Sequence, residues 1–185
     1  MNDTFFKEYF ELIKSNLDKV HIEDLKRVAL LAKDTSARGN KVIIAGNGGS
    51  AAMASHVSVD FTKVAKIRTI NFNESDLLTC FSNDYGYEKV FEKCVEFYGD
   101  KNDMLILISS SGNSPNVVNA AKYCNLSDIN VVTFTGFGND NKLKSLGKIN
   151  LWVDSKAYNI VEMTHHIMLL SVVDYIVGDI YYSAS

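Results

Sequence analysis

Hydrophobic and polar positions along this chain follow two alternating patterns. Short apolar runs bounded by polar residues are typical of strands buried on both faces, and longer stretches repeat apolar positions at helical spacing. Strands that alternate with helices predict a parallel sheet covered by helices on both faces. We therefore expect one α/β domain over residues 1–185. The predicted strands are 41–45, 67–72, 104–108, 130–135 and 149–153; the predicted helices are 3–20, 22–37, 53–63, 74–82, 87–98, 115–124, 142–146 and 160–182, with a turn at 83–86.

The first predicted helix, residues 3–20, carries a broad apolar face. A helix ahead of the first strand has no sheet partner fixed by crossover rules, so it packs either on its own domain or on a second subunit. We accordingly divide the chain into N-terminal helices, 1–38, that contribute to an oligomer, and an α/β core, 39–185. The aromatic residues of the first helix and the apolar last helix favour buried interfaces. These aromatic residues are Phe5, Phe6, Tyr9 and Phe10.

Composition narrows the classes of partner. The sequence is 46% hydrophobic and 22% charged, as in ordinary globular proteins, and its net charge is −3. It has no basic run that would follow a nucleic-acid backbone, so nucleic acid is not an expected ligand. Because the N-terminus does not resemble a signal peptide and no apolar run reaches membrane-spanning length, we expect a cytoplasmic protein without membrane contact. Three widely spaced cysteines predict neither a disulfide framework nor a cysteine metal site.

The loop after strand 104–108 combines several hydroxyl side chains with the start of a helix. Ser114 followed by Pro115, the only proline in the chain, is typical of an N-cap residue and the first residue of a helix. The loop's hydroxyls, its backbone N–H groups and the positive helix end would meet at one point, which favours an anion, phosphate first. An ordinary capped turn with solvent-facing serines is the alternative. The hydroxyls belong to Ser109, Ser110, Ser111 and Ser114.

A second turn suited to anion binding follows strand 41–45, and it is formed by Gly48, Gly49 and Ser50. This loop also satisfies the pattern G-x-G-x-x-A of dinucleotide-binding folds, but residues 66–73 lack the acidic side chain that would bind the ribose. No Gly-Lys-Ser/Thr follows, so a P-loop is excluded. Two such turns on neighbouring strands face one crevice, and a small phosphorylated ligand fits it better than a nucleotide.

Three motifs in this order closely resemble the sugar isomerase (SIS) domain of bacterial phosphoheptose isomerases. They are Gly46–Ala52, Asn83–Gly86 and Ser109–Asn116, and the likeness covers nearly the whole chain. The resemblance implies a three-layer sandwich with a five-stranded parallel sheet, and a homotetramer with active sites between subunits. It also implies conversion of sedoheptulose 7-phosphate to D-glycero-D-manno-heptose 7-phosphate, for lipopolysaccharide, capsule or other surface heptose.

The resemblance assigns roles to single residues. Phosphate contacts fall on the four serines of the loop after strand 104–108, and the first zinc ligand falls on His56. The second zinc ligand, a proton-transferring glutamate in the family, falls on Asp60, which is one methylene shorter. On the last helix, the family's glutamine and the histidine eight residues later fall on Glu162 and Leu170, and leucine neither binds zinc nor moves protons. The sugar contacts fall on Asn47, Gly48, Gly49, Asn83 and Asp84.

The residues themselves offer chemistry that fits this reaction. Moving a carbonyl between C1 and C2 needs a base that shuttles a proton through an enediol, and an acid or metal that stabilises charge on the oxygens. His56 and Asp60 share one helical face, and so do Glu162 and His166. These four are the candidate catalytic residues, acting either as an N/O zinc site or as acid–base groups without metal. The tentative zinc ligands are His56, Asp60 and Glu162.

The two adjacent histidines of the last helix point about 100° apart. At most one therefore faces the site, and we expect the other at the surface or at an interface. His166 is the candidate to replace the missing histidine from one turn earlier, and His165 is the second of the pair.

Three functions of different kinds remain open. The first is a phosphosugar isomerase, supported by the two loops, His56 and Asp60. The second is a non-catalytic SIS module that binds a phosphosugar or a protein partner for regulation or assembly, supported by Leu170. The third is a nucleotide-binding oxidoreductase domain, which rests on the glycine pattern alone.

Overall fold

A parallel sheet forms the middle layer of this computed structural model, which describes residues 4–182. Within that range the sheet has five strands in the order β2-β1-β3-β4-β5, and every neighbouring pair is parallel. The predicted α/β class and the five-stranded sheet are confirmed. The strands are β1 (Val42–Gly46), β2 (Thr69–Asn71), β3 (Met104–Ser109), β4 (Asn130–Thr135) and β5 (Ile149–Trp152).

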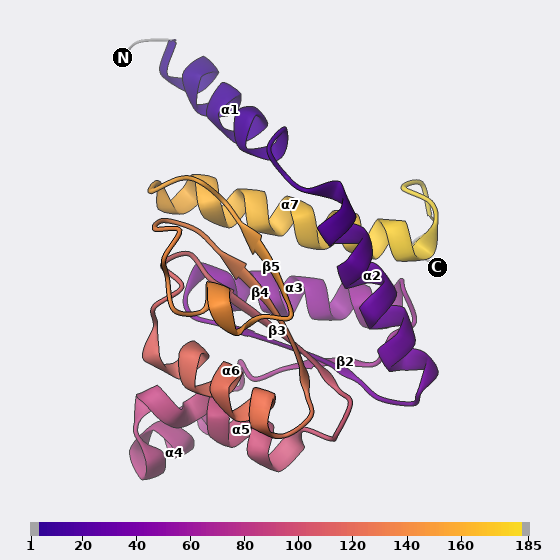
Figure 1. Cartoon of the computed structure of the whole chain (residues 1–185), viewed down its shortest axis with the longest axis vertical. Coiled ribbons are helices and arrows are strands. Elements are labelled where there is room, and N and C mark those ends of the chain that lie inside the picture. The colour runs from indigo at the N-terminus through magenta and orange to yellow at the C-terminus, as the bar shows by residue number, and fades with distance from the viewer. Residues whose placement is uncertain (1–3, 183–185) are drawn as a thin grey trace.

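Helices cover both faces of the sheet because alternate strand residues point to opposite sides. In β1 and β3, Ile44 and Ile106 belong to one hydrophobic core and Ile43 and Leu105 to another on the opposite face. Figure 1 shows the resulting three layers. The first core is covered by α2 (Ile22–Ala37), α3 (Gly49–Lys63) and α7 (Tyr158–Val177), and the second by α4 (Ser75–Tyr85), α5 (Val90–Tyr98) and α6 (Pro115–Leu126).

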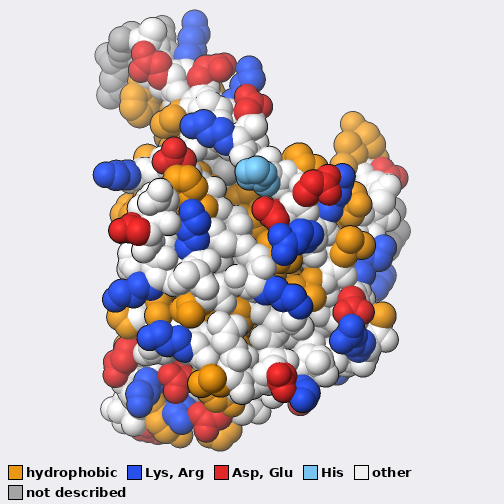
Figure 2. All heavy atoms as spheres, in the orientation of Figure 1, with side chains coloured by type: hydrophobic (Ala, Val, Ile, Leu, Met, Phe, Trp, Pro, Cys, Tyr) orange, Lys and Arg blue, Asp and Glu red, His pale blue; other side chains and the backbone are white. Residues whose placement is uncertain are grey.

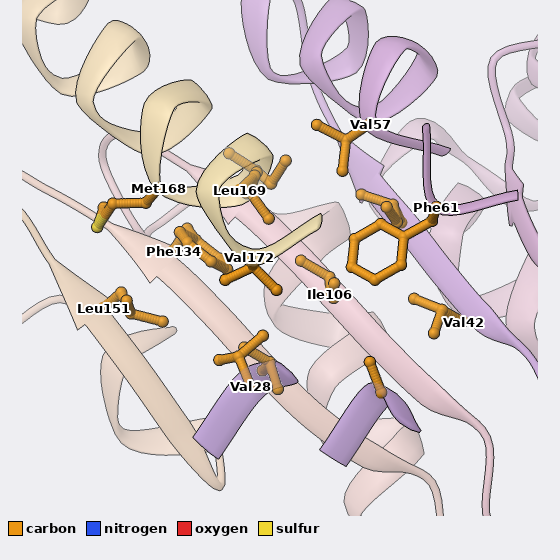
Figure 3. Packing of buried hydrophobic residues seen from close by; sticks show 14 of the residues in the cluster. Val28, Val42, Val57, Phe61, Ile106, Phe134, Leu151, Met168, Leu169 and Val172 are labelled. Atoms are coloured by element: carbon orange, nitrogen blue, oxygen red, sulfur yellow. The ribbon is translucent and has the colours of Figure 1, made fainter. Parts of the chain in front are cut away.

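The first core joins segments that are far apart in the sequence (Figure 3). Val28 of α2, Phe61 of α3 and Leu169 of α7 are fully buried, and they belong to the same cluster as Ile106 and Phe134 from the sheet. Each such side chain contributes about 1.5–3 kcal/mol by leaving water. The packing of α7 against α2 and α3 is what fixes the position of the last helix over the sheet.

The first helix, α1 (Thr4–Leu17), stands away from the body (Figures 1 and 2). Phe5, Phe6 and Phe10 are each more than 60% exposed, whereas Val28 in α2 is fully buried. Of the predicted N-terminal helices, α2 is therefore part of the α/β body, and α1 alone is left with an exposed apolar face.

Two predicted boundaries are wrong for the same physical reason. Residues 83–85, predicted as a turn, are the last residues of α4, which ends at Gly86 with φ +85°. The last helix, predicted to reach 182, ends at Val177 because Gly178 takes a left-handed conformation with φ +84°. Glycine ends helices in this way because it lacks the Cβ that resists positive φ. The remaining short elements are the 3₁₀ helices η1 (Tyr87–Lys89) and η2 (Lys144–Leu146).

Helix α7 corrects one expectation from the sequence. By length and composition alone it is apolar enough to cross a membrane, although no run of that kind was expected. Its residues Val161, Leu169 and Val172 are buried against the sheet and its neighbouring helices, as the core helix of a globular protein would be.

A buried ion pair fastens the amino ends of β1 and β3. Asp103 is fully buried and accepts hydrogen bonds from the backbone N–H of Lys41 at 3.0 Å and from the Lys41 ammonium at 2.6 Å. Burial alone would raise the pKa of Asp103, but these bonds and those from Asp100 and Asn40 outweigh it and hold the pKa below its ordinary value. This pair was not predicted from the sequence; it lies at the amino ends of the strands, opposite the two loops.

We predict that Asp103→Ala lowers the free energy of unfolding by about 3 kcal/mol, because the buried Lys41 ammonium keeps only the exposed Asp100 as a partner and two backbone N–H groups lose their acceptor. The lowered pKa means that this stabilisation is present near neutral pH and is lost as the pH falls through the folded-state pKa. Urea unfolding at two pH values measures both effects. Asp128→Asn, which breaks the exposed pair with Lys101, is the control and should cost under about 1 kcal/mol. Equal losses for the two variants would contradict the assignment.

Candidate active site

The loops after β1 and β3 meet at the point where the strand order reverses. These strands pair directly, with Gly46 opposite Ile108, but β1 leads into α3 on one face and β3 into α6 on the other. In open α/β sheets a crevice opens at such a point. A cavity of about 260 Å³ lies there, and both predicted loops line it together with two residues of α7. The cavity is lined by Asn47, Gly48, Gly49, Ser50, Ile108, Ser109, Ser110, Ser111, Ser114, Tyr158 and Glu162.

The four serines of the second loop divide into two pairs. The hydroxyls of Ser109 and Ser111 each accept a backbone N–H of their own loop at 3.2 Å, and so hold its shape. The buried hydroxyl of Ser110 finds no partner among residues 4–182, and Ser114, at the N-cap of α6, makes no capping hydrogen bond there. A buried hydroxyl without a partner is costly. Two hydroxyls beside a helix N-terminus are thus available to an anion, which favours an anion site over an ordinary capped turn with solvent-facing serines.

The glycine loop brings a carboxylate to the same cavity. Gly48 takes φ +55° at the N-cap of α3, a conformation that L side chains rarely adopt. A Cβ on Gly49 would overlap the carboxylate of Glu162, so the Glu162 side chain in this position lies directly against the Gly49 backbone. Glu162 lines the cavity from α7, beside the N-terminus of α3.

Two predicted sugar contacts lie elsewhere. Asn83 and Asp84, in the last turn of α4, are exposed and do not line the cavity within this chain. The Asn83 amide donates to the Asp84 carboxylate at 2.9 Å, and the Cys80 thiol lies 3.7 Å from the same carboxylate. Their role in sugar binding stays a prediction.

His56, Asp60 and His166 form a row of contacting side chains between α3 and α7. His56 Nδ1 lies 3.0 Å from His166 Nε2, and His56 Nε2 lies 3.4 Å from Asp60 Oδ2. Burial lowers the pKa of His166, the neighbouring His56 lowers it further, and Asp60 acts against both. The row does not line the cavity, but His166 follows Glu162 by one turn on the same helical face.

The predicted zinc ligands do not converge on one point. The two ring nitrogens of His56 face different partners, one towards Asp60 and one towards His166. Within residues 4–182, no group of three or more His, Cys, Asp or Glu side chains is placed to hold a metal ion. Zinc needs three or four donors aimed at a common centre. As arranged, these side chains do not fit a zinc ion.

The other histidine of the pair is a core residue. His165 is fully buried, its Nε2 lies 3.0 Å from the Thr135 carbonyl oxygen, and its ring packs edge-on against Phe134. Burial lowers its pKa to about 4, and the bond to Thr135 only partly opposes this. The expectation of a surface or interface histidine is therefore wrong. Leu170 is half-buried and packs against the first core.

Sequence reasoning missed Tyr158, the first residue of α7. It lines the cavity, and its ring packs against Phe137 with the centroids 4.8 Å apart. Tyr158 precedes Glu162 by four residues and so shares its helical face. The four-residue spacing from Glu162 was the feature of the sequence that could have identified Tyr158 as a site residue.

Comparison with known proteins agrees with the fold. The pattern of the SIS domain family matches residues 5–136, well over half of the chain. The chain therefore belongs to the SIS domain family, and within it to the phosphoheptose isomerases, as the resemblance predicted.

Individual relatives support this membership over nearly the full length. The chain is 34% identical to a phosphoheptose isomerase of Fusobacterium nucleatum, covering 91% of this chain and 90% of that protein. It is 35% identical to one of Helicobacter pylori, covering 91% and 92%. The solved structure of phosphoheptose isomerase from Neisseria gonorrhoeae superposes with a TM-score of 0.87 at 29% identity, covering 95% and 96%.

We predict that Ser110→Ala weakens binding of inorganic phosphate about tenfold, because a hydrogen bond to a charged group is lost. Its free energy of unfolding should stay unchanged or rise slightly, since the hydroxyl has no partner among the described residues. Titration calorimetry and urea unfolding measure the two quantities. The control Ser58→Ala removes a buried hydroxyl that donates to Ser55 and accepts from Asn71, so it should lose stability and keep phosphate affinity. The reverse pattern would contradict the phosphate site.

Proposed function

We propose that this chain is an aldose–ketose isomerase that converts sedoheptulose 7-phosphate to D-glycero-D-manno-heptose 7-phosphate. Relatives that are 34–39% identical to it are named phosphoheptose isomerases. One observation of this structure carries the proposal: the Glu162 carboxylate faces the same cavity as the unengaged hydroxyls of Ser110 and Ser114. Such an isomerisation needs a phosphate-binding site and a proton-transferring group in one cavity.

The two ends of the cavity bind different parts of the substrate. The phosphate binds at the N-terminus of α6, where Ser110, Ser114 and the first backbone N–H groups of the helix meet it. The carbonyl end reaches Gly49 and Glu162 at the N-terminus of α3. Glu162 takes the proton from C1 and returns it to C2, while a proton moves from the C1 hydroxyl to the C2 oxygen. The positive end of α3 stabilises the charge that develops on the enediolate oxygens.

A second acid–base group is needed to move the proton between the two oxygens. We propose His166 for this role, because it follows Glu162 by one turn on the same face of α7. His56 holds the His166 ring at 3.0 Å and is itself fixed by Asp60. No step is assigned to zinc, because the donors present do not fit the ion.

The second candidate function is a phosphosugar-binding module without turnover. The observation in its favour is Leu170, which stands where the family's histidine is expected and packs into the core instead. Binding of a phosphosugar without product formation is the result that would select this function.

We further propose a cytoplasmic homotetramer whose active sites lie between subunits and whose product supplies lipopolysaccharide, capsule or other surface heptose. The apolar face of α1 supports the assembly, since exposed apolar patches of this kind mark interfaces. The exposed position of Asn83 and Asp84 supports sites that include a neighbouring copy.

We predict that Phe6→Lys combined with Phe10→Lys dissociates the oligomer, because two charges would enter a buried apolar contact. Size-exclusion chromatography with light scattering gives the mass directly. Leu126→Lys, at a residue that is 89% exposed on α6, is the control and should leave the mass unchanged. A double variant with the mass of the wild type would refute the role of α1.

We predict that Glu162→Gln lowers turnover at least about 100-fold, because the amide cannot accept the proton. Proton NMR of sedoheptulose 7-phosphate in D₂O follows the new anomeric signals. Turnover by the wild-type protein should survive a chelator, and the affinity of the variant for inorganic phosphate should match that of the wild type. Glu23→Gln, on the exposed side of α2, is the control. Undiminished turnover by Glu162→Gln would remove the carboxylate from the mechanism.

A further inference from the structure

Three side chains from three separate segments are joined beside the cavity. Asn47, in the loop after β1, and Asn116, in the first turn of α6, exchange two hydrogen bonds of 2.9 and 2.8 Å. Tyr87 of η1 donates its hydroxyl to the Asn47 amide oxygen at 2.8 Å. Because Tyr87 directly follows the motif 83–86, this cluster, which we call the amide clasp, links all three family motifs.

The backbone fixes the orientation of both amides in the amide clasp. The Val117 backbone N–H, which can only donate, lies 3.0 Å from Asn116 Oδ1. Asn116 must therefore present its oxygen to this N–H and its nitrogen to Asn47 Oδ1. Asn47 Oδ1 consequently accepts from Asn116 and from Tyr87, and both of its acceptor sites are filled.

One polar group of Asn47 is left for a ligand. An amide nitrogen carries two hydrogens, and one of those on Asn47 is used by Asn116 Oδ1. The second remains, and Asn47 lines the cavity. Asn47 can therefore meet a sugar oxygen only as a donor, which suits a carbonyl or an enediolate oxygen.

The amide clasp also explains why the Ser114 hydroxyl caps no backbone N–H in the described part of the chain. An N-cap serine ordinarily accepts the N–H of the second or third helical residue. Here Pro115 is the first helical residue and Val117 the third, and the N–H of Val117 is taken by Asn116 Oδ1 instead. The Ser114 hydroxyl thus stays available beside the cavity.

We propose that Asn116 and Tyr87 are positioning residues: together they turn Asn47 into a dedicated donor to the sugar oxygen, and Asn116 additionally releases the Ser114 hydroxyl for the phosphate. This inference rests on the proposed isomerase function for its substrate. Tyr87 then affects binding of the sugar end alone, whereas Asn116 affects binding of both the sugar and the phosphate.

The first test is a double-mutant cycle. Tyr87 is 56% exposed, so Tyr87→Phe removes one hydroxyl without disturbing the core. We expect kcat/KM for sedoheptulose 7-phosphate to fall about fivefold while the affinity for inorganic phosphate stays unchanged. In an Asn47→Ala background the same change should have no further effect, because Tyr87 acts through Asn47. Tyr98→Phe, at another exposed tyrosine, should change neither quantity. Full additivity of the two substitutions would overturn the proposal.

The second test separates the two roles of Asn116. In Asn116→Ala the Val117 N–H loses its partner and takes up the Ser114 hydroxyl, so the affinity for inorganic phosphate should fall about fivefold along with kcat/KM. Ser114→Ala should then cost nothing more in this background. Undiminished phosphate affinity in a folded Asn116→Ala would refute the release of Ser114.

A third measurement keeps this inference distinct from the proposed function. The side-chain amide signals of Asn47 and Asn116 in ¹⁵N–¹H NMR spectra of the ligand-free protein report the amide clasp directly. Tyr87→Phe should shift both, and Tyr98→Phe neither. Absence of turnover in the wild type with these shifts present would reject the isomerase but not the amide clasp. Unshifted signals would reject the amide clasp whatever the wild type catalyses.

Discussion

The direct pairing of β1 with β3 is the constraint on which the site depends. Because Gly46 lies opposite Ile108, the loops that follow start at the same height and side by side. Because the chain then leaves these strands towards opposite faces, the loops diverge and leave a cavity between them. The buried pair of Lys41 and Asp103 secures the same two strands at their other ends.

Around this cavity, polar groups are divided between those that hold the protein together and those left for a ligand. Ser109 and Ser111 support their own loop, whereas the hydroxyls of Ser110 and Ser114 accept no such bond within residues 4–182. Asn47 uses three of its four polar sites within the protein. A preorganised site of this kind needs little reorganisation when the substrate binds and reacts. Such preorganisation is a main source of enzymatic rate enhancement. Glu162 reaches it from α7, and its carboxylate lies against Gly49, which has no side chain to overlap it.

The sequence was sufficient for the succession of strands and helices along the chain and for the two loops, because buried strands, the serine before Pro115 and the glycine turn are local signals. It failed where the outcome depends on packing between distant segments. The burial of His165 follows from the rotation of α7 over the sheet, which adjacent histidines do not reveal. The bond from Tyr87 to Asn47 joins residues 40 positions apart. Asn83 and Asp84 were recognised by motif, but their distance from the cavity depends on α4 continuing to Tyr85.

The most direct test of the central claim, that one phosphosugar spans the two loops, is a crystal structure with sedoheptulose 7-phosphate bound to Glu162→Gln. The account predicts the phosphate within hydrogen-bond distance of the Ser110 and Ser114 hydroxyls, and the C1–C2 end beside Gly49 and residue 162. A phosphate bound away from the serine loop, or a sugar directed away from residue 162, would contradict it.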